Sequence, residues 1–384
     1  MKVGICGLGL RMAYLAKCFT EHATPWCVTA YSDPAPVGLS YLQSHGISTG
    51  RSYATLDTML ASEALDLLLI GSPNHLHLEH IRAGLERGLK IFCEKPVVAN
   101  EDEAYQLLQL LKAHGTDAVM VGLVLRYSPL YRDLIAAIDG GVLGCISSIE
   151  ACEHVEPSHG AFFMRDWRRR SAYSGGFLLE KCCHDLDLYQ GAVGARPSRV
   201  VSFGGRRTFV PERRAVEHDP VYHRRRAGWA GASSVFEGDG DIVDHQTALI
   251  EYANGANLCF HTNLHVPDPY RHFCIVGTEA TAEGDFDRNF FRVRAARSGC
   301  LLQDSSYARG DSLGHYGAEE LMVADVCAHL SDNAALPVSV LDALEAGLTA
   351  IKLDEARLEG RIVDMGPVWE RVDRFGLRET GERR

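Results

Sequence analysis

The sequence predicts an α/β protein of two domains, the first built on a doubly wound parallel sheet and the second an α+β domain with a large open, mostly antiparallel sheet. Strand and helix patterns alternate along the first 122 residues, which is typical of repeated β-α-β units. Strand patterns dominate from residue 145 onward. A chain of 384 residues also exceeds what a single hydrophobic core usually serves. We therefore expect one domain at residues 1–122 and a second at residues 123–384.

Short apolar runs separated by helical patterns carry the prediction for the first domain. The expected strands are KVGICG, CVTAYSD, LDLLLIGS, KIFCEKP and AVMVGL, and the expected helices are residues 10–19, 77–88 and 101–115. LDLLLIGS is almost continuously apolar, as a strand buried on both faces should be. Short connections between these elements favour parallel strands with helices packed against the sheet.

The second domain is predicted from longer strand patterns. The expected strands are ISSIEACEHV, SRVVSFGG, HQTALIEYA, ANLCFHTNLHV and RHFCIVG, interrupted by a helix at residues 177–190 and followed by helices at residues 318–330 and 340–358. Residues 206–240 are rich in Arg, His, Gly and Pro and show no period. We expect them to form a long surface excursion that serves as a lid or an oligomer contact.

Composition limits the partners of the chain. A formal net charge of -11 argues against nucleic acid or an anionic membrane as a general partner. No apolar run approaches the roughly 18 residues of a membrane span, and the start MKVGICGLGL fits a first strand better than a signal peptide. The 12 cysteines are scattered through apolar contexts without a CxxC pair. We expect buried, reduced thiols in a cytoplasmic protein.

A glycine-rich turn follows the first expected strand and opens the first expected helix. Gly7 permits the tight turn, and Gly9 lets the backbone approach a pyrophosphate held at the helix N-terminus. Leu10 and Arg11 complete the turn, and Met12 stands where the dinucleotide fingerprint has its third glycine. That glycine usually allows close helix–strand packing, so its replacement perturbs the geometry without removing the phosphate cradle. The order strand, turn, helix predicts a Rossmann dinucleotide site.

Asp33 ends the second expected strand. Its carboxylate can accept hydrogen bonds from the adenosine ribose hydroxyls, and its charge repels a 2′-phosphate. The next basic residue in the sequence is Arg51, so no adjacent cation is available to NADP. We expect NAD rather than NADP. The alternative is that Asp33 only caps the turn before Pro34.

Two further loops follow the expected strands LDLLLIGS and KIFCEKP. They read SPNHLH at residues 72–77 and CEKP at residues 93–96, and nucleotides bind at the carboxyl ends of such strands. Together with GLGLRM and GGFLLEKCCHDLD, these loops resemble the Gfo/Idh/MocA oxidoreductases over residues 1–358. The resemblance implies NAD(P)-dependent chemistry on a secondary carbinol of a sugar, sugar derivative or cyclitol. It also implies cofactor contacts for Ser72, Pro73, Asn74, His77, Glu94 and Lys95, and a homodimer or homotetramer formed through the open sheet of the second domain.

Lys95 matches the lysine that the family places against both the nicotinamide ribose and the substrate hydroxyl. An ammonium near the reacting oxygen stabilises a developing alkoxide, so the role suits the residue type. The alternative is a solvated loop lysine paired with Glu94.

The stretch GGFLLEKCCHDLD places Glu180, His184 and Asp187 on one helical face. The family pattern there has an acid, a histidine and an aspartate at the same spacing. Histidine titrates near pH ~6.5, so the resemblance makes His184 the acid/base partner of Lys95. Glu180 replaces the usual aspartate and is expected to orient the imidazole or to hold a substrate hydroxyl. Cys182 replaces a usual glycine.

The same stretch also admits a metal site, with Cys183 as a neighbouring ligand. A catalytic zinc site usually brings HExxH-like spacing, which the sequence does not contain. We therefore expect no metal.

Further substrate contacts are expected from Arg126, from Trp167 and Arg168, and from Tyr316 near the start of a late helix. The tryptophan face suits the C–H surface of a sugar, and the arginine suits hydroxyls or a carboxylate. Two other functions stay open. One is a glycosidase or lyase that uses tightly bound NAD for transient oxidation and elimination, and the other is a non-catalytic NAD(P)-binding sugar sensor.

Overall fold

The computed structural model describes residues 1–384 except 23–25, 226–227, 308–314 and 379–384. The chain divides into two compact units. Unit 1 comprises Met1–Ser128, Gly310–Leu344 and Phe375–Leu377. Unit 2 comprises Pro129–Arg309, Glu345–Arg374 and Arg378–Arg384.

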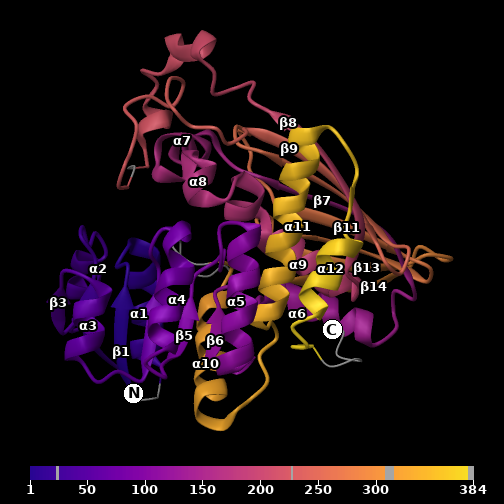
Figure 1. Cartoon of the computed structure of the whole chain (residues 1–384). Helices are drawn as coiled ribbons and strands as arrows, with labels where there is room; N and C mark the ends of the chain where they lie inside the picture. The colour runs from indigo at the N-terminus through magenta and orange to yellow at the C-terminus, as the bar shows by residue number, and fades with distance from the viewer. Residues whose placement is uncertain (23–25, 226–227, 308–314, 379–384) are drawn as a thin grey trace. The chain divides into compact units, whose positions relative to one another are not determined.

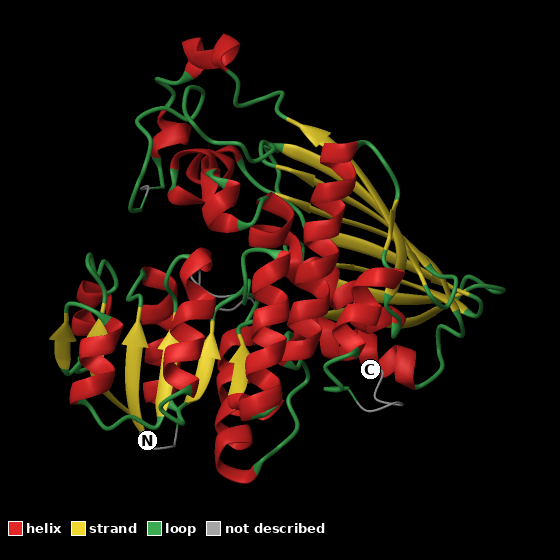
Figure 2. Cartoon of the chain, viewed as in Figure 1, coloured by secondary structure: helices red, strands yellow, loops and turns green. Residues whose placement is uncertain are grey.

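Unit 1 is a parallel, doubly wound sheet in the order β3-β2-β1-β4-β5-β6 (Figures 1 and 2). Its strands are β1 (Lys2–Cys6), β2 (Cys27–Ser32), β3 (Arg51–Tyr53), β4 (Leu67–Ile70), β5 (Lys90–Cys93) and β6 (Val119–Val121). Its helices are α1 (Leu10–Glu21), α2 (Leu39–Ser44), α3 (Leu56–Ser62), α4 (His77–Leu85), α5 (Glu101–His114) and α10 (Ala318–Asp332). The order reverses beside β1, the place where open α/β sheets bind ligands.

Burial in unit 1 follows the sequence pattern. All four residues of β4 are buried, as its continuous apolar run predicts. The strand register aligns Cys6 with Ile70 and Ile70 with Cys93, so β1, β4 and β5 end at one edge of the sheet. The loops that follow these strands are therefore neighbours.

Unit 2 is built on a nine-stranded sheet in the order β14-β13-β12-β11-β7-β10-β9-β8-β15. Its strands are β7 (Ile146–His154), β8 (Pro197–Gly205), β9 (His245–Tyr252), β10 (Asn257–Asn263), β11 (His272–Gly277), β12 (Ala280–Asp285), β13 (Phe290–Ala295), β14 (Leu301–Ser306) and β15 (Val363–Asp364). Its helices are α6 (Pro129–Asp139), α7 (Pro157–Arg165), α8 (Ser171–Ser174), α9 (Phe177–Val193) and α12 (Gly366–Asp373), and α11 (Val340–Glu359) joins the unit from Glu345 onward. Only the pairing of β7 with β10 is parallel among these strands.

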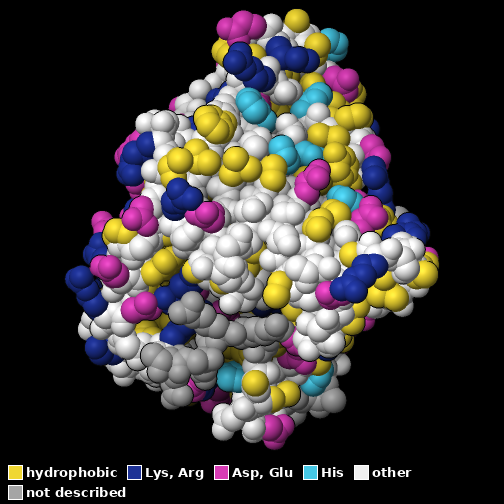
Figure 3. Space-filling view, turned by 90° about the vertical axis from the view of Figure 1, so that its right-hand side faces the viewer, with side chains coloured by type: hydrophobic (Ala, Val, Ile, Leu, Met, Phe, Trp, Pro, Cys, Tyr) yellow, Lys and Arg dark blue, Asp and Glu magenta, His cyan; other side chains and the backbone are white. Residues whose placement is uncertain are grey.

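One face of the nine-stranded sheet packs against helices, and the other carries exposed apolar side chains (Figure 2). Phe203 is 67% exposed on β8, Leu249 is 45% exposed on β9, and Val276 is 40% exposed on β11. Figure 3 shows hydrophobic side chains and histidines gathered on one side of the molecule. Alternation of buried and exposed positions along β9 and β10 is typical of an antiparallel sheet with one covered face.

The described residues of the segment 206–240 pack on their own unit. The Asp244 carboxylate accepts hydrogen bonds from the backbone N–H groups of residues 207–209 at 2.7–3.1 Å. Tyr222 is buried between the rings of Phe209 and Phe236. The excursion also reaches the segment before α9, where Asp239 Oδ1 accepts from Arg169 Nε at 2.8 Å. The segment expected to be a surface excursion therefore has a small aromatic core of its own.

The predicted fold class is confirmed, with a parallel sheet in one unit and a mostly antiparallel one in the other. The expected division of the chain at residue 122 differs from the observed units, because unit 1 also takes in residues 123–128, Gly310–Leu344 and Phe375–Leu377. Helix α10 belongs to unit 1, where it packs on α1, although it lies in the stretch that we assigned to the second domain. Strands β3 and β12–β15 were not predicted from the sequence. β3 has three residues and β15 has two.

Candidate active site

The glycine-rich turn of unit 1 has the conformation that a phosphate cradle needs. Gly7 has φ +85°, and a Cβ at this position would lie 2.4 Å from the backbone N of Ser72, so only glycine fits. Gly9 is the N-cap residue of α1, and a Cβ there would meet nothing within 4 Å. The space above the helix N-terminus is thus open to a ligand.

Met12 takes the place of the third fingerprint glycine and is buried. A Cβ on Gly71, at the end of β4, would lie 2.9 Å from Met12 Cε and 3.0 Å from the Gly7 carbonyl oxygen. The missing glycine on α1 is therefore matched by Gly71, directly after the neighbouring strand β4, and the helix still packs closely on the sheet.

Asp33 follows β2 and holds two backbone segments together. Its Oδ2 accepts from the Leu8 N–H at 2.6 Å, and its Oδ1 accepts from the Ala35 N–H at 2.6 Å. The first bond places the carboxylate directly beside the glycine-rich turn. Each oxygen has a second lone pair, so the bonds to Leu8 and Ala35 leave acceptor capacity for ribose hydroxyls.

The loops after β4 and β5 are joined by His77. Its Nδ1 lies 2.7 Å from the Pro96 carbonyl oxygen and its Nε2 lies 2.8 Å from the Ser72 carbonyl oxygen. Next to it, the Ser72 hydroxyl lies 2.9 Å from His80 Nδ1. His77 was expected to contact the cofactor, and the structure places its ring between two loop carbonyls.

Glu94 and Lys95 follow β5. The Glu94 side chain is buried against Gly122, where a Cβ would lie 3.2 Å from the Glu94 carboxylate carbon. Glu94 Oε1 accepts a hydrogen bond from Arg11 Nε at 3.1 Å. This ion pair ties the loop that carries Lys95 to the first turn of α1. Asn74, in the loop after β4, is also buried. Glu94 is thus paired with Arg11, which the sequence analysis had placed in the cofactor turn.

These residues fit a dinucleotide. The turn at Gly7 is glycine-specific, the N-terminus of α1 is open, and Asp33 stands where the ribose would lie. The sheet edge that carries this turn also carries the Ser72 and Glu94 loops. Unit 1 is therefore built as an NAD-binding domain.

In unit 2, Glu180 lies in the first turn of α9 and is 4% exposed. Arg168 Nε donates to Glu180 Oε1 at 2.5 Å, and Arg168 also donates to Asp166 Oδ1 at 2.8 Å. Burial alone would lower the pKa of Arg168, but the two carboxylates outweigh it and raise that pKa above its usual value. Glu180 thus holds an arginine, a pairing the sequence analysis did not predict.

Arg168 also lies over aromatic rings. Its guanidinium carbon is 4.3 Å from the centroid of the Trp167 ring and 5.3 Å from that of Phe162. The Trp167 ring is buried. Arg168, Trp167 and Glu180 therefore form one packed group in unit 2.

His184 and Asp187 lie on the same side of α9 as Glu180, and both side chains are buried. An adjacent side of the helix carries Lys181 and Asp185. The role of Lys181 and Asp185 was not predicted, although side chains spaced i,i+4 on a helix are neighbours.

Lys181 and Asp185 belong to a buried chain of four charges. Lys181 Nζ lies 2.9 Å from Glu153 Oε1, Glu153 Oε2 pairs with Arg271, and Arg271 Nε lies 3.1 Å from Asp185 Oδ1. Burial raises the pKa of Asp185 to about 7 although Arg271 opposes the shift. This chain joins α9 to β7 and to the residue before β11, so it fixes the helix that carries His184.

Cys182, which replaces the family glycine, is completely buried. Burial, with Asp185 and Glu153, raises the pKa of its thiol far above the usual value. Among the described residues, no group of three or more His, Cys, Asp or Glu side chains is placed to hold a metal ion. In the same part of the chain, no helix is long and apolar enough to cross a membrane.

Two other expected substrate residues lie in unit 1. Arg126 is buried in the short turn after β6. Tyr316 precedes α10 in a left-handed conformation with φ 58°. The neighbouring His315 Nδ1 lies 2.6 Å from Glu319 Oε1.

Known protein families match the sequence of both units. The model of the GFO/IDH/MocA oxidoreductase family with an NAD-binding Rossmann fold matches residues 1–123, and the GFO/IDH/MocA C-terminal domain matches residues 131–283. The oxidoreductase YteT of Bacillus subtilis (strain 168) is 26% identical over 346 residues, which cover 78% of this chain and 80% of YteT. A 2,7-anhydro-N-acetylneuraminate hydratase of Mediterraneibacter gnavus is 28% identical over 171 residues, 44% of each chain.

Solved structures share the fold. Levoglucosan dehydrogenase in complex with NADH and levoglucosan has a TM-score of 0.76 at 18% identity and covers 95% of this chain and 99% of its own. Myo-inositol 2-dehydrogenase from Lactobacillus plantarum has a TM-score of 0.74 at 18% identity, with the same coverage. The two-unit architecture is therefore that of known dehydrogenases.

The contact between Gly71 and Met12 predicts that Gly71→Ala weakens dinucleotide binding. The added methyl has to displace Met12 or the Gly7 carbonyl, so we expect the Kd for NADH to rise about 10-fold and the free energy of unfolding to fall by ~1–3 kcal/mol. Fluorescence titration with NADH and denaturant unfolding measure both. Gly347→Ala is the matched control, because a Cβ there meets only Leu179 at 3.5 Å. Equal NADH affinity in the two variants would contradict the packing explanation.

The environment of His80 predicts that unit 1 becomes less stable to unfolding at acidic pH. Burial, followed by the charge of His77, lowers its pKa from 6.5 to about 4. Because the unfolded chain binds this proton more tightly than the folded chain does, protonation of His80 favours unfolding. The free energy of unfolding therefore loses nothing to His80 above pH ~6.5, and it falls by at most ~3 kcal/mol as the pH drops toward 4. We expect His80→Gln to reduce this loss between pH 7 and 4.5, measured by denaturant unfolding. An unchanged pH dependence in the variant would show that His80 is not the group responsible.

Proposed function

Because the chain belongs to the Gfo/Idh/MocA oxidoreductase family, whose models match both of its units, we propose that it acts on a secondary carbinol of a sugar, sugar derivative or cyclitol. NAD, when bound, supplies the hydride acceptor or donor for the carbinol carbon. The names of the structural neighbours, levoglucosan dehydrogenase and myo-inositol 2-dehydrogenase, support this substrate class.

The observation that carries the proposal is the ion pair between Glu94 and Arg11. It joins the residue next to Lys95 to the turn that cradles the pyrophosphate, at 3.1 Å. Lys95 therefore belongs to the dinucleotide edge of the sheet. A lysine at this edge is suited to stabilise a carbinol oxygen as it loses its proton.

We assign the proton transfer to Lys95 and His184. His184 lies one turn after Glu180 on α9, a helix fixed by the buried chain of four charges. An imidazole held in this way is suited to accept the hydroxyl proton during oxidation and to return it during reduction. Lys95 would face the same oxygen from unit 1.

Glu180 acts on the substrate through Arg168 in this proposal. The carboxylate of Glu180 accepts from Arg168 Nε at 2.5 Å, and the guanidinium stacks on Trp167. The Arg168 guanidinium has five N–H donors, of which the bonds to Glu180 and Asp166 use two. Its remaining donors suit the hydroxyls of a polyhydroxylated substrate.

The test is a panel of sugars, sugar acids and inositols, assayed with NAD and NADP. We expect Lys95→Ala and His184→Ala each to lower kcat on the best substrate by about 10²- to 10⁴-fold, the usual contribution of a positioned acid or base. Lys90→Ala is the matched lysine control, because Lys90 pairs with the exposed Asp117 at the start of β5. Near-native rates in both variants would refute the assignment.

A second candidate is a lyase or hydratase that oxidises its substrate transiently and then returns the hydride. The relatives from Mediterraneibacter gnavus and Escherichia coli that are named 2,7-anhydro-N-acetylneuraminate hydratase favour it. Absorbance at 340 nm separates the two candidates, since a dehydrogenase accumulates NADH during turnover and a transient-oxidation enzyme does not.

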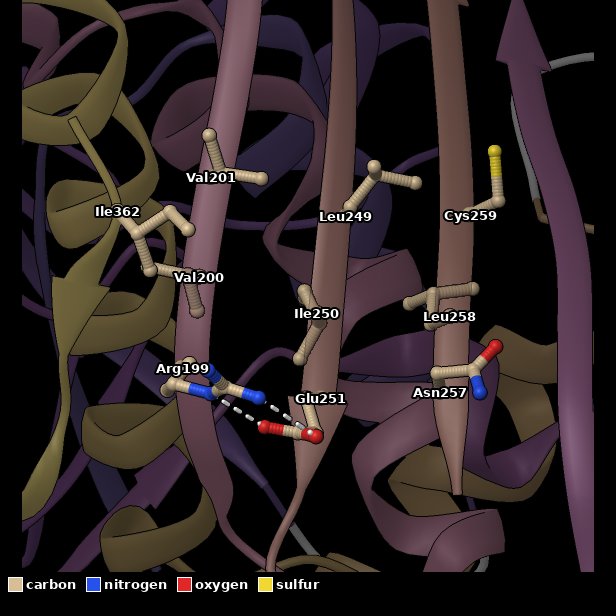
Figure 4. A pocket seen from close by; sticks show the side chains of 10 residues that line it. All are labelled: Arg199, Val200, Val201, Leu249, Ile250, Glu251, Asn257, Leu258, Cys259 and Ile362. Carbon is tan, nitrogen blue, oxygen red and sulfur yellow. Dashed lines mark hydrogen bonds and ion pairs between the residues drawn. The ribbon is translucent and has the colours of Figure 1, made fainter. Parts of the chain in front are cut away.

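We also propose that the open face of the nine-stranded sheet pairs with a second copy of the chain. Figure 4 shows Val201, Leu249 and Cys259 side by side on β8, β9 and β10, with Ile362 beside them and the Arg199–Glu251 ion pair below. Leu249 and Ile362 are exposed and Val201 and Cys259 are half-buried, and an apolar row of this kind is typical of an interface.

Leu249→Lys should shift the mass in solution toward that of a monomer, because the change buries a charge in the proposed contact. Light scattering after size exclusion measures the mass. Val37→Lys changes a comparably exposed apolar residue outside the sheet and should leave the mass unchanged. A monomeric native chain, or an oligomer unaffected by Leu249→Lys, would contradict the proposed interface.

A further inference from the structure

Four charged or titratable side chains of unit 1 form a connected group, the Arg11 cluster: Arg11, Glu94, His315 and Glu319. Arg11 donates from Nε to Glu94 Oε1 at 3.1 Å and from NH1 to Glu319 Oε1 at 2.5 Å. Glu319 Oε1 also lies 2.6 Å from His315 Nδ1, and its Oε2 accepts from the His315 backbone N–H at 2.6 Å. One carboxylate from the late helix α10 thus reaches the first turn of the dinucleotide site.

Glu319 is the buried centre of this cluster. Its side chain is 0% exposed, whereas that of Arg11 is 28% exposed. Burial alone would raise the pKa of Glu319, but the hydrogen bonds and charge of His315, with the charge of Arg11, hold it at about 2. The carboxylate is therefore ionised at neutral pH, and its partners compensate its desolvation.

Arg11 lies where its pairing with Glu319 affects the binding of a dinucleotide. Arg11 lies in the first turn of α1, directly after the open N-terminus at Gly9. The pyrophosphate expected there is negatively charged, and Glu94 and Glu319 bring two carboxylates close to it. A guanidinium held between the two acids screens them from the phosphates, and it can do so only while both bonds keep it in place.

We propose that Glu319 is a positioning residue of the dinucleotide site, which acts by fixing Arg11 against Glu94. Through this contact α10 sets the geometry of the turn that binds the pyrophosphate. The inference concerns cofactor binding alone, so it holds whatever substrate the enzyme uses.

The test is the affinity of the full chain for NADH, measured by fluorescence titration without substrate. We expect Glu319→Ala to raise the Kd about 10-fold or more, the effect of losing a charge-assisted hydrogen bond. Glu320→Ala is the matched control, since Glu320 is the next residue of α10 and accepts from the Tyr14 hydroxyl at 3.1 Å rather than from Arg11. We expect its Kd to stay within twofold of the native value.

A double-mutant cycle separates positioning from general damage. If Glu319 acts through Arg11, the double variant Arg11→Met/Glu319→Ala binds NADH no more weakly than Arg11→Met alone. Multiplied single effects, or an unchanged Kd in Glu319→Ala, would overturn the inference. If Glu319→Ala does not yield folded protein, Glu319→Gln carries the same test, because it keeps an oxygen acceptor for Arg11 and loses the charge.

Discussion

The structure depends on a close approach between two backbone segments of unit 1. Gly7 lies so near Ser72 that a Cβ would come within 2.4 Å of its backbone N, and Gly71 lies against Met12 in the same contact. Because parallel strands β1 and β4 end together, the glycine turn and the Ser72 loop share one edge. The hydrogen bonds of the His77 ring to the Ser72 and Pro96 carbonyl oxygens then tie the loop after β5 to the loop after β4. The close approach at Gly7 therefore holds together the three loops at the end of β1, β4 and β5.

Unit 2 meets a different constraint, since its central helix is buried on every side. Helix α9 carries Glu180, Lys181, His184, Asp185 and Asp187, and isolated charges are costly in such a place. Three of these side chains are compensated in two groups: Arg168 pairs with Glu180, while Glu153 pairs with Lys181 and Arg271 with Asp185. A buried ion network of this kind contributes little net stability, but the loss of one partner is costly because it leaves a buried charge unpaired.

Much of this could be predicted from the sequence, and the remainder depends on contacts distant in the chain. The β-α-β alternation and the turn at Gly7 are local patterns, so the fold class and the NAD-binding domain were predicted correctly. The bond between Arg11 and Glu319 spans 308 positions, and no local pattern indicates which sheet α10 joins. The partner of Glu180 was missed for the same reason, because a carboxylate on a helix does not reveal which arginine reaches it.

The central claim is that Lys95 and His184 act on one carbinol oxygen beside the cofactor. A crystal structure of the chain with NADH and its best substrate measures this most directly. The account predicts that Lys95 Nζ and a ring nitrogen of His184 both lie within hydrogen-bond distance, about 2.6–3.2 Å, of the reacting oxygen. A closed complex in which either group lies more than about 10 Å from that oxygen would contradict it.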